Sequence, residues 1–265
     1  MNWRRVTIAL LFVSTAAMAN PFGHLSVLVP IDPGSAPGAF GTLWTTKLWI
    51  TNLSAGDATI VCDSGVTCPA LKANSTTALE TSPYAGAPHP GFFITIPVPF
   101  GSATGQQQVW MSLRTSDSST APKSAGTEIP LVRLNQFSKT PFALPQVPAN
   151  DHSRSRLRLY GIGNGQVNVR VIGINSKQEL MNVSLALTGG DTPTNNFFGI
   201  PQVKFPSYAE LALPDFSASD SMVRVEITPA ADLLTWGFVS VTDDLSQQFT
   251  IVSPSQTDYV AESVA

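Results

Sequence analysis

The feature that most constrains the fold of this chain is an alternation of apolar and polar side chains. It is clear in Arg156–Tyr160, Val167–Val171 and Val223–Ile227, and it recurs in Val109–Arg114. Successive side chains of a β-strand point to opposite faces of a sheet, so a period of two predicts strands with one face on a core and the other in water. The sequence sustains no apolar stripe at helical spacing. We therefore expect very little helix.

Turn-forming residues separate these segments. The chain holds 19 Gly and 21 Pro, and only 12% of its residues are charged. Asn164-Gly165 predicts a hairpin, because both central residues of the favoured tight turn need positive φ. Low charge with frequent turn formers and many β-branched residues is typical of exported all-β proteins. The predicted fold class is therefore all-β.

The sequence also contains an internal repeat. Five segments of the first half resemble five segments of the second half in the same order and at a nearly constant offset. The pairs are Lys47–Trp49 with Arg158–Tyr160, Ala58–Val61 with Val167–Arg170, Phe92–Pro97 with Phe197–Pro201, Val109–Leu113 with Val223–Ile227, and Val132–Pro145 with Val239–Pro254. A repeat of this length indicates a duplicated domain.

We interpret the chain as two tandem immunoglobulin-like β-sandwich domains, because about seven short strands per copy is typical of that fold. The domains would span 24–147 and 153–255, joined by the turn-rich segment 145–152 and followed by a C-terminal tail at 256–265. A larger single sandwich or a jelly roll is the alternative.

Three segments carry a family resemblance: Val27–Pro30, Phe40–Asn52 and Trp236–Asp244. They resemble recurring motifs of exported bacterial immunoglobulin-like β-sandwich proteins of unassigned function. The second half departs from the pattern, since it lacks the Trp of the opening motif and begins with Arg154-Ser155-Arg156. The resemblance implies the fold and export, and it implies no active site.

The N-terminus has the organisation of a secretion signal. Arg4 and Arg5 precede the short apolar run Val6–Val13, and Ala17-Met18-Ala19 offers the small side chains of a cleavage site. A membrane anchor is the alternative, but spanning a bilayer takes about 20 apolar residues. We expect residues 1–19 to be a signal peptide, and the mature chain to be secreted or periplasmic without membrane insertion.

The charge of the chain bears on its partners. The formal net charge is −3 at pH 7, and loss of the basic leader would make it more negative. Nucleic acids and anionic membranes bind concentrated basic surfaces, so neither is expected as a partner. The expected partner is an extracytoplasmic protein or a glycan, and no motif implies a cofactor.

Cys62 and Cys68 flank a short segment that contains Gly65 and can fold back on itself. In an exported chain, two such cysteines predict a disulfide bond. The alternatives are a redox pair and a zinc site. The spacing is not that of Cys-x-x-Cys, and no second Cys/His pair lies nearby in the sequence.

Catalytic patterns are not found in the sequence. The histidines lie in Pro-, Gly- or Ser-rich context, and the nucleophile motif Gly-x-Ser-x-Gly does not occur. Asp243-Asp244 could bind calcium, but too few further oxygen ligands accompany this pair. We therefore predict that the protein is not an enzyme and holds no metal.

Two groups of residues are candidates for binding. Arg154, Arg156 and Arg158 share one face of a predicted strand, which is either a site for an anionic polymer or, as we favour, a solvated face. Tryptophans form the second group, and they could stack on sugars. Because they lie within strand patterns, we favour buried anchors over ligand-binding residues. They are Trp44, Trp49, Trp110 and Trp236.

The sequence thus predicts an exported, non-catalytic β-sandwich protein with a structural, adhesive or partner-binding role. The alternative is a carbohydrate-binding module, with Trp44, Trp49 and Trp110 as ligand-binding residues. If the protein binds a partner, the longer loops of the first half, at 64–90 and 115–127, are expected to supply the contacts.

The mature protein is expected to begin at Asn20, because Ala17 and Ala19 fit the pocket of the signal peptidase. N-terminal sequencing of material exported by a bacterial host checks this. Exported protein that still begins at Met1 would contradict it.

Overall fold

The computed structural model describes residues 24–38, 41–62, 68, 70–80, 90–97, 109–119, 126–195, 201–216 and 220–254. The expected leader and tail lie outside these ranges, as do parts of the two long loops. Antiparallel strands dominate, no α-helix occurs in the described ranges, and η2 (Leu134–Gln136) is a single 3₁₀ turn. The all-β prediction is confirmed.

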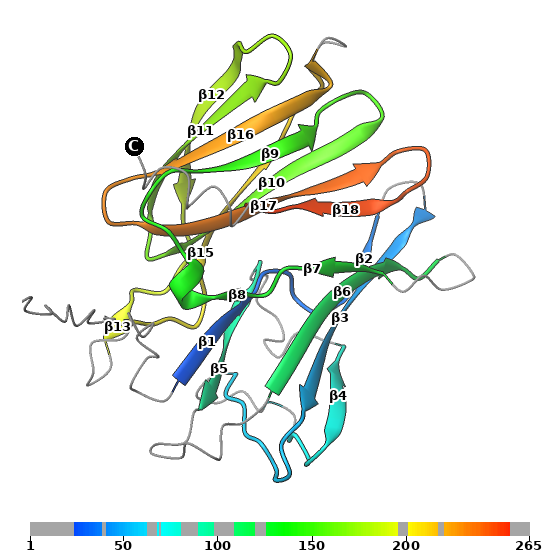
Figure 1. The fold of residues 1–265 in the computed structure, drawn as a ribbon, viewed down its shortest axis with the longest axis vertical. Helices are drawn as coiled ribbons and strands as arrows, with labels where there is room; N and C mark the ends of the chain where they lie inside the picture. Colours follow the sequence, from blue (N-terminus) through cyan, green and yellow to red (C-terminus); the bar gives the residue numbers. More distant parts are fainter. Residues whose placement is uncertain are drawn as a thin grey trace, which may run out of the picture.

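The first half is a two-sheet sandwich, in the lower part of Figure 1. One sheet has the order β5-β1-β8, and the other has the order β2-β3-β6-β7 with β4 also paired to β3. The strands are β1 (His24–Val29), β2 (Gly34–Pro37), β3 (Leu43–Asn52), β4 (Ser75–Leu79), β5 (Phe92–Pro97), β6 (Val109–Asp117), β7 (Thr127–Ile129) and β8 (Val132–Arg133).

The second half forms another sandwich, from sheets β15-β10-β17-β18 and β12-β11-β16-β9. A small hairpin of β13 (Thr194–Asn195) and β14 (Pro201–Gln202) stands apart from them. The other strands are β9 (Phe142–Pro148), β10 (Ser153–Ile162), β11 (Gly165–Gly173), β12 (Glu179–Leu187), β15 (Ser207–Ala212), β16 (Met222–Pro229), β17 (Leu234–Asp243) and β18 (Phe249–Val252).

The two sandwiches share one pairing order. The order β5-β1-β8 corresponds to β15-β10-β17, and β4-β3-β6 corresponds to β12-β11-β16, with corresponding strands in the same sequence order. The match of Val109–Leu113 with Val223–Ile227 links β6 with β16, and these strands correspond. The start of the match of Val132–Pro145 with Val239–Pro254 links β8 with β17, which also correspond, whereas its continuation links β9 with β18 of a different sheet. The match of Lys47–Trp49 with Arg158–Tyr160 instead links β3 with β10, which hold different positions. Phe197 and Phe198 lie outside the described residues.

The pairing agrees only in part with an immunoglobulin sandwich. There, strand B pairs with E in one sheet, C pairs with F in the other, and the last strand lies beside F. Here β10 pairs with β15, and β11 pairs with β16 in the opposite sheet. The following strand β17 lies beside β10 rather than beside β16. The two-sheet architecture is therefore firm, and the last strand departs from the immunoglobulin order.

The hairpin predicted at Asn164-Gly165 is wrong. The turn there connects β10 to β11, but these strands lie in opposite sheets and do not pair with each other. Both strands bury apolar side chains in the core between the sheets, including Leu159 on β10 and Val167 on β11. The chain therefore crosses from one sheet to the other at this turn. β10 pairs with β15 and β17, and β11 pairs with β12 and β16.

The segment expected to link the domains contains a strand. β9 pairs with β16 at the edge of a second-half sheet, and Phe142, Leu144 and Val147 lie in the core of the second sandwich. Pro145 and Pro148 are tolerated because an edge strand need not donate every ladder hydrogen bond. By strand pairing, residues 142–148 thus join the second half, whereas we expected the first domain to extend to residue 147. The division into two domains stays a prediction.

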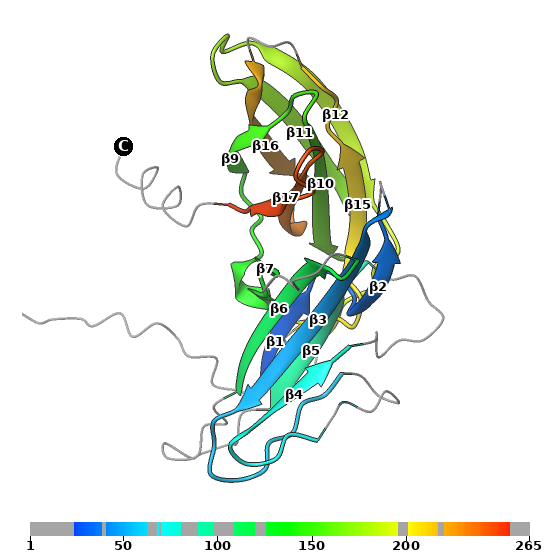
Figure 2. The same cartoon turned by 90° about the vertical axis from the view of Figure 1, so that its right-hand side faces the viewer.

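The sheet β15-β10-β17-β18 is buried on both faces at one end. Side chains such as Leu159 and Val239 face the second core, whereas Tyr160, Trp236 and Phe238 pack into the core of the first half. The Tyr160 hydroxyl donates a hydrogen bond to the carbonyl oxygen of Pro30. Figures 1 and 2 show the two sandwiches next to each other at this end of the sheet. The halves are therefore joined by a continuous apolar interior.

Backbone hydrogen bonds also cross this junction. The Phe93 N–H donates to the carbonyl oxygen of Lys204 at 2.9 Å, and Ser138 and Thr235 exchange a reciprocal pair at 2.9 and 2.8 Å. Thr127 Oγ1 donates to the carbonyl oxygen of Phe249 at 2.5 Å. Such bonds fix the orientation of the sandwiches as well as their contact.

Replacing Trp236 by Ala is expected to lower the free energy of unfolding by about 3–5 kcal/mol, because it empties a buried site at the junction. Trp110→Ala is the matched control, since the same atoms are removed from an exposed indole, and it should change stability by no more than about 0.5 kcal/mol. Guanidinium chloride unfolding followed by circular dichroism measures both. Equal losses in the two variants would contradict the role of the junction.

Candidate functional site

Two exposed tryptophans lie on the outer face of the sheet that contains β3 and β6. The side chain of Trp49 is 39% exposed and that of Trp110 is 56% exposed. In the β3–β6 ladder, Trp49 lies opposite Ser112 and Trp110 lies opposite Thr51. The two indoles therefore project from the same face as diagonal neighbours, a separation that aromatic side chains can bridge.

The alternation of β3 and β6 places these tryptophans outward. Leu48, Ile50 and Leu113 are fully buried in the first core. Because neighbours in a strand point to opposite faces, burial of these residues directs Trp49 and Trp110 to the solvent. The interpretation of all four tryptophans as buried anchors is therefore wrong for these two.

Small side chains surround the two indoles. Trp49 lies between Ala78 of β4 and Ser112 of β6. In the next row, Thr51 and Thr76 share a hydrogen bond of 2.9 Å between their hydroxyl oxygens. The indoles therefore rise above short neighbours, and Thr51 and Thr76 among these carry hydroxyl groups. We name this surface the aromatic face and define it by Trp49, Thr51, Thr76, Ala78, Trp110 and Ser112.

A row of four charged residues borders the aromatic face. Lys47 of β3 lies directly opposite Arg114 of β6. Lys47 Nζ is 2.7 Å from Glu80 Oε1, and an Arg114 guanidinium nitrogen is 3.6 Å from Glu128 Oε2. The two cations thus lie side by side in the middle of the row, and each has its carboxylate on the outer side.

Trp44 is not part of this face. It lies near the start of β3, it is half-buried, and its ring centroid is 5.6 Å from that of Phe249 on β18. Of the predicted ligand-binding residues, the structure therefore brings together Trp49 and Trp110 and places Trp44 at the junction. Trp236 is 7% exposed and packs as a buried anchor.

The three arginines of β10 share one face, as expected, and carboxylates pair with them there. Arg154 contacts Asp244 through an ion pair. Glu210 accepts a hydrogen bond from Arg156, and one of its carboxylate oxygens is 3.4 Å from Arg158 Nε. The described structure places no exposed aromatic side chain in register with them, since the neighbouring Tyr160 is buried. These contacts favour the solvated-face interpretation.

Glu210 is held ionised by its neighbours. Burial of the carboxyl opposes ionisation, but hydrogen bonds from Tyr208 and Arg156, together with the charge of Arg158, outweigh it and hold the pKa of Glu210 below its usual value. Burial raises the pKa of Tyr160, so its hydroxyl keeps the proton that it donates to Pro30.

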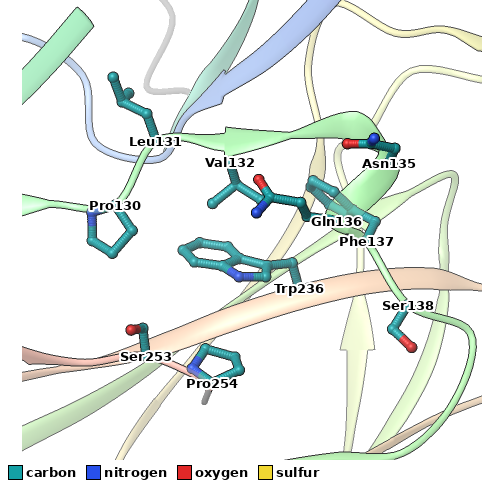
Figure 3. A pocket seen from close by; sticks show the side chains of 10 residues that line it. All are labelled: Pro130, Leu131, Val132, Asn135, Gln136, Phe137, Ser138, Trp236, Ser253 and Pro254. Carbon is teal, nitrogen blue, oxygen red and sulfur yellow. The ribbon is translucent and has the colours of Figure 1, made fainter. Parts of the chain in front are cut away.

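A cavity of about 490 Å³ lies where the two sandwiches meet. Trp236 lies among the residues that line it, with Pro130 and Val132 from the first half and Pro254 after β18 (Figure 3). Gln136 at its rim accepts a hydrogen bond from the backbone N–H of Arg133 at 2.8 Å. The Trp236 ring already contacts Tyr160 and Phe238 at centroid distances of 5.9 and 5.5 Å. So little indole surface is open that the cavity offers less stacking area than the aromatic face.

Cys62 and Cys68 lie at disulfide distance, with Cα atoms 5.5 Å apart. Cys62 is buried in the first core, and Cys68 packs against that core. Among the described residues, no group of three or more His, Cys, Asp or Glu side chains could hold a metal ion. No helix within the same ranges has the length and apolar character needed to cross a membrane.

Fold and site together define an all-β protein with two antiparallel β-sandwiches and an exposed aromatic face. Comparisons with protein-family models, with curated proteins and with solved structures return no match to this chain. The geometry of the face must therefore carry the functional argument.

Glu210→Gln is expected to reduce the dependence of stability on pH in acid. A carboxyl whose pKa is lowered by folding contributes stability above its unfolded pKa of about 4.3, and this contribution is lost as the pH falls through the folded pKa. The free energy of unfolding of the wild type should therefore fall more steeply below about pH 5 than that of the variant. Asp232→Asn, on an exposed loop, controls for the loss of one charge. Parallel curves for wild type and Glu210→Gln would contradict the assignment.

Proposed function

We propose that this protein is an exported, non-catalytic binding protein whose aromatic face holds a glycan chain. The observation that carries the proposal is the pair of exposed, diagonally placed indoles of Trp49 and Trp110. Contiguous exposed apolar surface rimmed by polar groups is uncommon unless it binds something. The proposal favours the carbohydrate-binding alternative over a purely structural role.

The chemistry of the face suits a sugar chain. The C–H-rich face of a pyranose ring packs on an indole, while its hydroxyl groups seek hydrogen bonds from neighbouring polar groups. Thr51 and Thr76 supply hydroxyls beside the two indoles. Successive outward side chains along a strand are about 6.8 Å apart, so the rows of Trp49 and Trp110 can contact separate sugar units of one chain.

The position of the face differs from the loop contacts expected from the sequence. Its residues lie on β3, β4 and β6, within the first half but on the sheet itself. A rigid sheet holds flat side chains at fixed spacing more firmly than a loop does. This arrangement suits a repeating polymer better than a partner of irregular shape.

We also propose that the two sandwiches are copies of one immunoglobulin-like domain, in line with the resemblance to exported bacterial proteins of that fold. The shared pairing order and the matches of β6 with β16 and β8 with β17 support this. The cysteine pair supports a location outside the cytoplasm, where disulfides persist. The proposal involves no catalysis, no nucleic acid and no membrane insertion.

Trp49→Ala and Trp110→Ala are each expected to weaken glycan binding about tenfold or more, because central aromatic anchors carry most of the energy of such contacts. The mature protein is screened on a glycan array and on insoluble polysaccharides, and affinities for the glycans retained are then measured by calorimetry. Leu245→Ala is the control, since it removes another exposed apolar side chain from the second half.

The double variant, Trp49→Ala with Trp110→Ala, should keep the wild-type circular dichroism spectrum and melting temperature while losing binding. Retention of wild-type affinity by this folded double variant would overturn the proposed site. A wild-type protein that binds none of the glycans would overturn the function.

A further inference from the structure

We infer that the aromatic face selects an acidic glycan, whose carboxylate is held between Lys47 and Arg114 while its sugar ring stacks on Trp49. This inference rests on the proposed function and specifies its ligand class. It concerns the border of the face, where the charged row crosses from β4 to β7.

The first argument is the register of the two cations. Lys47 and Arg114 are direct cross-strand partners. Like charges placed directly opposite each other destabilise a sheet, so this pairing is costly unless anions relieve it. Glu80 pairs with Lys47 and Glu128 pairs with Arg114, each from the outer side of the row. A ligand carboxylate between the two cations would relieve the same repulsion.

The second argument is the distance to the nearest indole. Lys47 and Trp49 are outward residues two positions apart on β3, and Arg114 and Ser112 are so placed on β6. This step is about 6.8 Å, so a ring that covers Trp49 brings a substituent at its edge over the cation pair. Trp110 lies one further row away, where the next sugar unit of the same chain would pack.

The third argument is that the existing ion pairs can be displaced. The side chains of Lys47 and Glu80 are 38% and 58% exposed, and those of Arg114 and Glu128 are 40% and 55% exposed. Exposed ion pairs contribute little to stability, because water and salt screen them. A ligand carboxylate can therefore replace a glutamate, and the planar guanidinium of Arg114 can accommodate it with two parallel hydrogen bonds.

The arginines of β10 do not offer the same combination. Arg156 and Arg158 share Glu210, and the aromatic ring next along the same face, that of Tyr160, is buried. A cation pair beside an exposed indole is found, among the described residues, at Lys47, Arg114 and Trp49. The charge and the stacking surface coincide there.

The test compares two polymers with one backbone. The mature protein is titrated with polygalacturonate and with its fully methyl-esterified form, which lacks the charge. The wild type is expected to bind the acidic polymer at least tenfold more tightly, and this preference should shrink as the salt concentration rises. Sulfated dextran, with neutral dextran beside it, shows whether a sulfate can replace the carboxylate.

Matched variants assign any preference to the cation pair. Lys47→Gln with Arg114→Gln should remove the preference for the acidic polymer, so that this variant binds both polymers with similar affinity. Lys72→Gln, which removes an exposed lysine paired with Asp57 away from the face, should have no effect. Glu80→Gln with Glu128→Gln should act in the opposite direction and raise affinity for the acidic polymer, a gain that a misfolded protein would not give.

The outcomes separate the inference from the function on which it rests. Equal affinity for both polymers, or a preference that survives Lys47→Gln with Arg114→Gln, overturns the acidic ligand while binding through Trp49 and Trp110 stands. Binding to neutral glycans alone would also overturn the acidic ligand and leave the proposed function in place. A wild type that binds no glycan in the wider screen overturns both.

Discussion

The packing of Tyr160, Trp236 and Phe238 into the first half is the constraint on which the rest of the structure depends. These side chains project from one face of the sheet β15-β10-β17-β18. Leu159 and Val239 project from the other face into the second core. Because the outer face of this sheet is buried at one end, the sheet cannot separate from the first half without exposing large apolar surface. Each half therefore depends on the other to bury apolar side chains, even though the two halves repeat one order of strand pairing.

The sequence predicts strands well and their partners poorly. A period of two requires only that one face be buried, and it is visible locally in segments such as Val167–Val171. Pairing depends on residues far apart in sequence, so Asn164-Gly165 can satisfy the chemistry of a hairpin and still connect opposite sheets. The sequence places β9 in the first half for a related reason. Its prolines indicate a linker. The burial of Phe142, Leu144 and Val147 in the second core becomes visible only once β9 is paired with β16.

The candidate site could have been located from the sequence by a stricter use of the same period. Lys47, Trp49 and Thr51 share one parity, and Leu48 and Ile50 share the other, so the polar neighbours already indicate that Trp49 faces water. Trp110, Ser112 and Arg114 repeat the pattern on β6. Tryptophan is usually a buried anchor, so residue type and strand parity give opposite predictions for Trp49. The diagonal placement of the two indoles still required the β3–β6 register.

The aromatic face and the junction lie in different parts of the first sandwich, and this separation has a consequence for function. The inner residues of β3 and β6 build the first core, which continues into the junction through Tyr160 and Trp236. The outer residues of the same strands remain available for a ligand. Because the core fixes the inner set, the outer set is held at the spacing of the ladder. The junction therefore supports the sheet from which the proposed binding face projects.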